Sequence, residues 1–126
     1  MAGGGRHVLV IEDEPNIVEA IRFILDRDGW RVSAHGRGGD AIEVIRAAAP
    51  DVLILDVMLP GRSGYEILRE LRADDATAAL PVLMLTARGQ SRDRAQAERA
   101  GTSHFIAKPF ANSDVLAALR ALVGEG

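Results

Sequence analysis

The chain contains no cysteine, which excludes disulfides, thiolate metal sites and a thiol nucleophile. Its apolar runs are short, and the one from Val52 to Leu55 ends at Asp56. A membrane-spanning helix needs ~20 apolar residues, so no membrane insertion is expected. The four apolar residues that follow His7 are too few for the core of a signal peptide. We therefore expect a cytoplasmic protein.

Lysine is almost absent as well, because Lys108 is the single lysine among 15 basic residues. The net charge of −3 offers no basic surface for nucleic acid or for an anionic membrane, so no direct nucleic-acid binding is expected. The proportions of hydrophobic and charged residues, 48% and 26%, are those of a globular protein. A length of 126 residues predicts one domain over 1–126, with a core of about 6–123 and a flexible terminus at 1–5.

Short apolar runs alternate with longer amphipathic segments along the chain. This pattern predicts strands over 7–11, 31–34, 52–55, 82–85 and 105–107. It predicts helices over 15–28, 40–49, 63–72, 90–100 and 112–123. Strands separated by helices must be parallel, so the predicted fold class is α/β, a five-stranded sheet doubly wound with five helices. The order 2-1-3-4-5 is one of two common orders, and the number of helices does not decide between them.

Polar side chains follow the predicted strands, at the edge where open parallel sheets form their sites. They are Glu12, Asp13, Asp56, Thr86 and Lys108. Three carboxylates in one place repel one another, and a bound divalent cation removes that conflict. An all-oxygen site with room for water suits Mg²⁺, or Mn²⁺ in its place. A carboxylate there can attack phosphorus, while the ammonium, the hydroxyl and a backbone N–H stabilise the phosphoryl oxygens.

Four blocks of the sequence resemble the receiver domain of two-component response regulators, the CheY-like family. The blocks are Val8–Pro15, Leu55–Gly61, Leu83–Arg88 and Phe105–Phe110, and the resemblance spans residues 6 to 123. All four occur in order and at predicted strand ends, which makes the combination specific. The resemblance implies the strand order 2-1-3-4-5 of a flavodoxin-like fold.

The resemblance also implies a metal site and a phosphoacceptor. It implies that Asp56 accepts the phosphoryl group. It places Mg²⁺ on Asp13, Asp56 and the backbone carbonyl of Met58, with Glu12 assisting through water. The pair Glu12–Asp13 departs from the commoner Asp–Asp pair of the family, so we expect metal binding to persist with altered affinity.

Further implied residues contact the phosphoryl group or change with it. Thr86 and Lys108 are expected on the phosphoryl oxygens, and the small Ala87 leaves room for the phosphate. A cis peptide before Pro109 is expected to aim the lysine. Phe105 is expected to turn between outward and inward rotamers on phosphorylation.

The resemblance implies two kinds of partner. A sensor histidine kinase or a histidine phosphotransfer protein supplies the phosphoryl group, and a downstream protein binds the face formed by segments 90–100, 105–107 and 112–123. Segment 90–100 has only alanine as apolar residue, so it is expected to open most easily and to reorder on activation. Ser103, His104 and Ala118 stand where the transcription-factor class carries the charges of its dimer interface. We therefore expect a monomer.

Other interpretations of the sequence remain open. The chain is predicted to be a stand-alone signalling switch that catalyses only its own phosphorylation and dephosphorylation, or else the receiver part of a larger, DNA-binding regulator. A phosphatase of the haloacid-dehalogenase type would need a second acid two residues after its nucleophile, where this chain has Met58. A degenerate receiver that only binds partners would not need all of the strand-end groups that are present.

Overall fold

The computed structural model describes residues 5–86, 95 and 98–124. Within them, five parallel strands form one sheet in the order β2-β1-β3-β4-β5. The strands are β1 (His7–Ile11), β2 (Arg31–His35), β3 (Val52–Asp56), β4 (Val82–Thr86) and β5 (His104–Ala107). The helices with described bounds are α1 (Pro15–Arg27), α2 (Ala41–Ala48), α3 (Gly64–Ala73) and α5 (Asn112–Leu122). The predicted fold class and strand order are confirmed.

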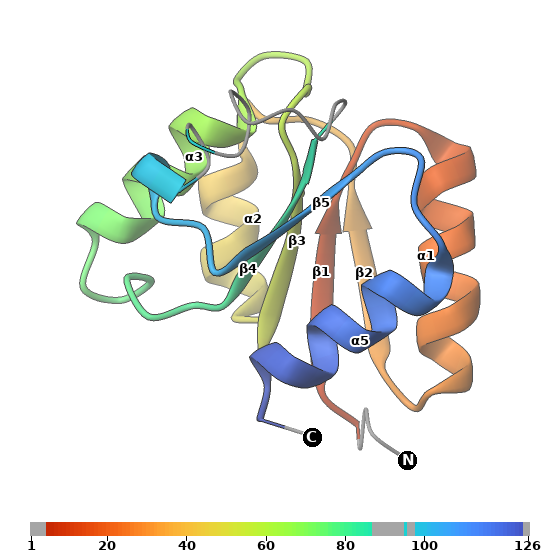
Figure 1. Ribbon diagram of the computed structural model, residues 1–126. Helices are drawn as coiled ribbons and strands as arrows, with labels where there is room; N and C mark the ends of the chain where they lie inside the picture. Colours follow the sequence, from red (N-terminus) through yellow and green to blue (C-terminus); the bar gives the residue numbers. More distant parts are fainter. Residues whose placement is uncertain (1–4, 87–94, 96–97, 125–126) are drawn as a thin grey trace.

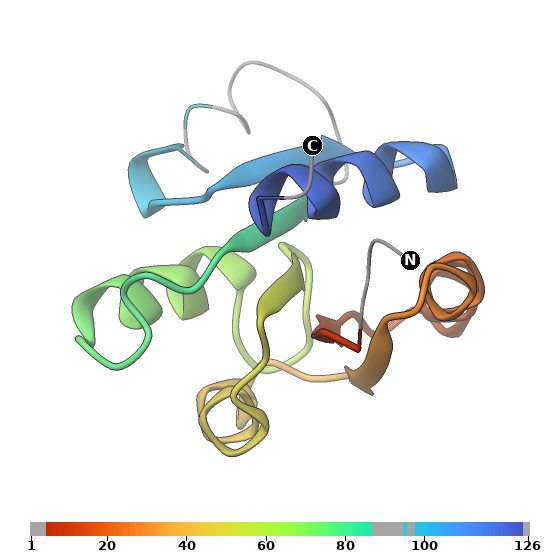
Figure 2. The ribbon, with the colours of Figure 1, turned by 90° about the horizontal axis from the view of Figure 1, so that it is seen from below.

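Helices cover both faces of the sheet. Helices α1 and α5 lie on one face, and α2 and α3 lie on the other (Figures 1 and 2). Successive residues of a strand point to opposite faces, so each strand contributes to two cores. In β3, Leu53 and Leu55 pack toward α2 and α3, whereas Val52 and Ile54 pack toward α1 and α5.

Central and edge strands differ in burial. Every residue of β3 and β4 is buried, which explains their continuous apolar sequences. Strand β2 lies at one edge and is only partly buried, in agreement with its alternating pattern. The helix predicted over 90–100 lies largely outside the described residues, although residues 95 and 98–100 are helical.

Local signals set the helix ends within a residue or two of the predicted ones. Pro15 starts α1, where its missing N–H costs nothing. Ser63 is the N-cap of α3 and not its first residue: its Oγ accepts from the N–H of Glu66 at 3.2 Å, and the Glu66 side chain accepts from the N–H of Ser63 at 3.4 Å. No helix in the described part of the chain is long and apolar enough to cross a membrane.

Candidate functional site

The carboxyl ends of the strands bring the predicted polar residues together. Glu12 and Asp13 directly follow β1, Asp56 ends β3, and Thr86 ends β4. Lys108 directly follows β5. Ala87 and Arg88 lie outside the described residues.

Lys108 lies at the centre of this group. Its Nζ is 2.7 Å from Oε1 of Glu12 and 3.1 Å from Oδ1 of Asp56. The two carboxylate residues are buried, with exposed fractions of 2% and 1%. The single lysine of the chain therefore neutralises part of a buried negative charge that would otherwise be costly.

Burial and neighbouring charge shift the ionisation of this group. Burial raises the pKa of Glu12 to about 7, and Asp56 acts in the same direction while Lys108 opposes both. Burial alone would lower the pKa of Lys108. Its carboxylate partners outweigh burial, so the Lys108 pKa is raised and the side chain is an ammonium.

The acidic residues fit a divalent cation. Glu12, Asp13 and Asp56 each offer an oxygen, and these atoms lie within 4.8 Å of one another. Oε1 of Glu12 and Oδ1 of Asp56 are buried and, despite their short contacts to Lys108, have no hydrogen bond of good geometry among the described residues. Carboxylate oxygens gathered in this way can bind a further positive ligand, and oxygen donors suit Mg²⁺ or Mn²⁺.

Backbone geometry ties Thr86 to Lys108. Thr86 pairs with Ala107 in the sheet, and the N–H of Lys108 donates to the carbonyl of Thr86 at 2.7 Å. The side chain of Thr86 is buried, with 1% exposed. The peptide bond between Lys108 and Pro109 is cis.

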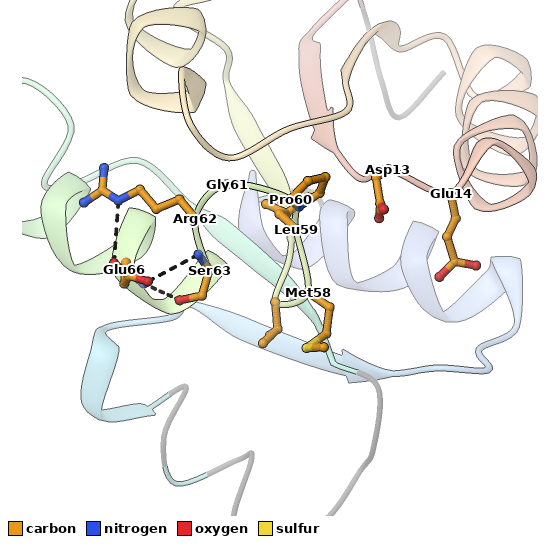
Figure 3. A pocket seen from close by; sticks show the side chains of 10 residues that line it. Asp13, Glu14, Met58, Leu59, Pro60, Gly61, Arg62, Ser63 and Glu66 are labelled. Atoms are coloured by element: carbon orange, nitrogen blue, oxygen red, sulfur yellow. Dashed lines mark hydrogen bonds and ion pairs between the residues drawn. The ribbon is translucent and has the colours of Figure 1, made fainter.

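A cavity of about 740 Å³ opens beside the acidic group. Figure 3 shows Asp13 and Glu14 on one side of it and the loop from Met58 to Ser63 on the other. The side chain of Met58 is exposed, with an exposed fraction of 67%. The site is thus accessible to a ligand from the side of this loop.

The residues predicted to take part in partner binding or to disfavour dimerisation lie in β5, in α5 and just before β5. Phe105 is partly buried in β5 and packs against the core under α2 and α3. Ala118 is buried in α5. Ser103 Oγ accepts from the N–H of Val82 at 3.0 Å, so its hydroxyl anchors the start of β4.

Two residues near the site were not singled out from the sequence. Glu14 lies 3.6 Å from Nζ of Lys108, and its N–H donates to Oε2 of Glu12 at 3.3 Å. Glu14 belongs to the block Val8–Pro15 together with Glu12, and this position was the one indication in the sequence that it lies near the site. Gly64 is the other: a Cβ there would lie 2.2 Å from the carbonyl oxygen of Asp56. Only glycine allows α3 to start so close to the end of β3.

Comparison with known proteins identifies the family. Residues 8–120 match the response regulator receiver domain. The chain belongs to this family. Receiver domains are signalling switches that generally bind Mg²⁺ at an acidic pocket and interact with histidine kinases and downstream effectors.

Several relatives of this receiver domain are transcriptional regulators. The chain is 41% identical to the transcriptional regulatory protein CseB of Streptomyces coelicolor over 117 residues, 93% of this chain and 49% of CseB. It is 35% identical to the phosphate regulon transcriptional regulatory protein PhoB of Escherichia coli over 118 residues, 94% of this chain and 52% of PhoB. The chain thus spans about half the length of the curated relatives it matches.

A solved structure extends the similarity to a chemotaxis protein. The chemotaxis response regulator CheY4 of Vibrio cholerae superposes with a TM-score of 0.87 at 25% identity, covering 94% of this receiver domain and 98% of CheY4. The same fold therefore occurs both as half of a longer regulator and as nearly a whole chain.

Proposed function

We propose that this receiver domain is a phosphorylation switch that takes a phosphoryl group onto Asp56 from a histidine kinase or a histidine phosphotransfer protein. The observation that carries the proposal is the contact of Lys108 with both Asp56 and Glu12 at the carboxyl edge of the sheet. A phosphoryl group on Asp56 would lie next to this ammonium, which could form an ion pair with a phosphoryl oxygen. The cavity beside Asp13 gives the donor access.

In the proposed reaction, a carboxylate oxygen of Asp56 attacks the phosphorus of a phosphohistidine. The new O–P bond forms as the P–N bond breaks, and the imidazole leaves and takes up a proton. The ammonium of Lys108 and the hydroxyl of Thr86 face the negative charge that develops on the phosphoryl oxygens. Attack of water on the phosphorus later breaks the O–P bond to Asp56, releases inorganic phosphate and restores the carboxylate. The lack of a side chain at Gly64 leaves the backbone of Asp56 undisturbed, because a Cβ there would collide with its carbonyl.

The metal-binding residues of the proposed site are Asp13, Asp56, the backbone carbonyl of Met58 and Glu12. Mg²⁺ held by these residues would supply positive charge against the carboxylates and against the phosphoryl group. Asp13 is exposed and Asp56 is buried, so the two carboxylates approach the site from solvent and from the sheet.

The output of the proposed switch is a change in affinity for a downstream protein at the face that contains β5 and α5. Phe105 belongs to β5 and packs on the side of the sheet under α2 and α3, and we expect its rotamer to follow the phosphorylation state. We expect a monomer. The half-length match to CseB and PhoB supports a second possibility, in which this domain is the receiver of a longer, DNA-binding regulator.

The test is phosphorylation by acetyl phosphate in the presence of Mg²⁺, followed by intact-protein mass spectrometry. Asp56→Asn is expected to abolish incorporation because it removes the nucleophile. Asp75→Asn is the matched control, because Asp75 is an exposed residue after α3. Full incorporation on Asp56→Asn would contradict the assignment of Asp56.

A further inference from the structure

Two loops beside the proposed metal site touch through their backbones. One loop connects β2 to α2, and the other connects β3 to α3. The N–H of Gly38 in the first loop donates to the carbonyl of Pro60 in the second at 2.9 Å. Gly38 is buried, whereas Gly36 and Gly39 on either side of it are exposed.

Gly38 has no room for a side chain. A Cβ at this position would lie 2.3 Å from the carbonyl oxygen of Arg62 and 3.0 Å from its Cβ. The φ of Gly38 is outside the left-handed region, so glycine is needed here for the close approach alone. A Cβ at Gly39 would meet nothing within 4 Å. The two adjacent glycines therefore differ only in what lies next to them.

The loop from β2 to α2 is held at both of its ends. At its start, the carbonyl of His35 accepts from the N–H of Glu12 at 3.0 Å. His35 Nε2 lies 2.7 Å from Oδ1 of Asp40 across the loop, and α2 begins with the buried residue Ala41. In the facing loop, Met58, Pro60 and Gly61 are exposed. A side chain added at position 38 would clash with the backbone of Arg62 and push the two loops apart, which would shift the segment 58–62 relative to the loop from β2 to α2.

The ends of the displaced segment are fixed to the sheet and to Asp56. The N–H of Val57 donates to the carbonyl of Leu85 at 3.1 Å, and the N–H of Gly64 donates to the carbonyl of Val57 at 2.9 Å. Any displacement is therefore concentrated between these two anchors. The backbone carbonyl of Met58 lies within that segment.

We infer that Gly38 is a positioning residue for the metal site: its backbone contact with residues 60–62 holds the Met58 carbonyl where a cation can use it. This inference rests on the proposed function. It assigns the loop from β2 to α2 a part in metal binding although it contributes no ligand. Mutation of residues that orient metal ligands typically weakens metal binding by about 10- to 100-fold.

The test measures Mg²⁺ affinity by calorimetry and unfolding by urea on Gly38→Ala and Gly39→Ala. Gly38→Ala is expected to weaken Mg²⁺ binding by about tenfold. Gly39→Ala is expected to bind Mg²⁺ like the wild type. A folded Gly38→Ala protein with wild-type Mg²⁺ affinity would overturn the inference and leave the proposed function intact. A wild-type protein that neither binds Mg²⁺ nor becomes phosphorylated would overturn both.

A second measurement uses the wild-type protein and so does not depend on the folding of a variant. If the contact supports metal binding, Mg²⁺ must in turn strengthen the contact. Hydrogen exchange followed by NMR is expected to show a slower Gly38 amide with Mg²⁺. The Thr77 amide, which donates to the carbonyl of Asp74 in a turn after α3, is expected not to change. Equal exchange of the Gly38 amide with and without Mg²⁺ would overturn the inference.

Discussion

Two partly buried cations, Lys108 and Arg72, have opposite surroundings in this molecule. Lys108 contacts the carboxylates of Glu12 and Asp56. Arg72 extends from α3 and donates instead to backbone carbonyls, at 2.7 Å to Gly101 and at 2.7 Å to Leu80. Burial lowers the pKa of Arg72, whereas the carboxylates outweigh burial and raise the pKa of Lys108.

The two cations differ in the charge of the groups that accept their hydrogen bonds and ion pairs. The carbonyls around Arg72 belong to the backbone and carry no net charge, and the hydrogen bonds of Arg72 join α3 to the segments before β4 and β5. The carboxylates around Lys108 repel each other, and two of their buried oxygens lack a hydrogen bond of good geometry among the described residues. A bound cation would reduce the repulsion within such a group, which is the property that the proposed switch requires.

The largest expected effect is on the rate of phosphorylation, which should fall when Lys108 is replaced and stay the same when Arg72 is replaced. Lys108→Met should slow phosphorylation by acetyl phosphate by about 100-fold or more, because a charge facing the phosphoryl oxygens is lost. The Arg72→Met variant should be phosphorylated at the wild-type rate. The rates are measured at saturating Mg²⁺ by mass spectrometry. Equal rates for Lys108→Met and the wild type would remove the distinction.

The free energy of unfolding should show the opposite order, with a larger loss when Arg72 is replaced than when Lys108 is replaced. Arg72→Met leaves several carbonyls without their donor and should lower the free energy of unfolding by about 3 kcal/mol. Lys108→Met, measured with saturating Mg²⁺, should change it by less than about 1 kcal/mol, because the cation replaces the lost charge. Urea unfolding gives both values. A larger loss for Lys108→Met would make that lysine a structural residue as well.

The raised pKa of Glu12 predicts a pH dependence of metal binding. Glu12 takes up a proton as the pH falls through its value of about 7, and the neutral acid is a poor ligand. Mg²⁺ affinity should therefore fall about tenfold between pH 8 and pH 6, and calorimetry measures it. Glu12→Gln should flatten this dependence. An equally steep dependence in Glu12→Gln would assign the proton to another group.

A conventional ion pair should give the smallest effect. Arg120 donates to Oδ1 of Asp28 at 2.7 Å, and this hydrogen bond holds the Asp28 pKa below its ordinary value. Asp28→Asn should cost about 1 kcal/mol at neutral pH. Because the folded-state pKa is lowered, the contribution is complete above the ordinary value of 3.8 and is lost as the pH falls below it. Urea unfolding of the wild type and the variant at several pH values tests this; a difference independent of pH would contradict it.

Much of the site could be predicted from the order of residues. Glu12, Asp56 and Lys108 each directly follow or end an apolar run, and parallel strands bring such positions to one edge. The contribution of Glu14 could not be predicted, because it depends on how far the lysine side chain reaches. The pKa of Glu12 could not be predicted either, because it depends on burial of the carboxyl group, which sequence does not reveal.

The glycines of the loop from β2 to α2 also show what the sequence can predict and what it cannot. Gly36 to Gly39 indicate a loop, and the structure has a loop there. Nothing in the order of residues distinguishes Gly38 from Gly39. The distinction arises because Arg62, from another loop, lies against one of them and not the other.

By itself, the sequence determined the fold class, the parallel strands and the edge at which the acids and the lysine gather, because these follow from local periodicity and from chain connectivity. Only the tertiary structure decided that Lys108 contacts two buried carboxylates and that Gly38 excludes a side chain. These features depend on approaches of a few ångströms between segments distant in the chain, and such approaches are set by packing and not by pattern.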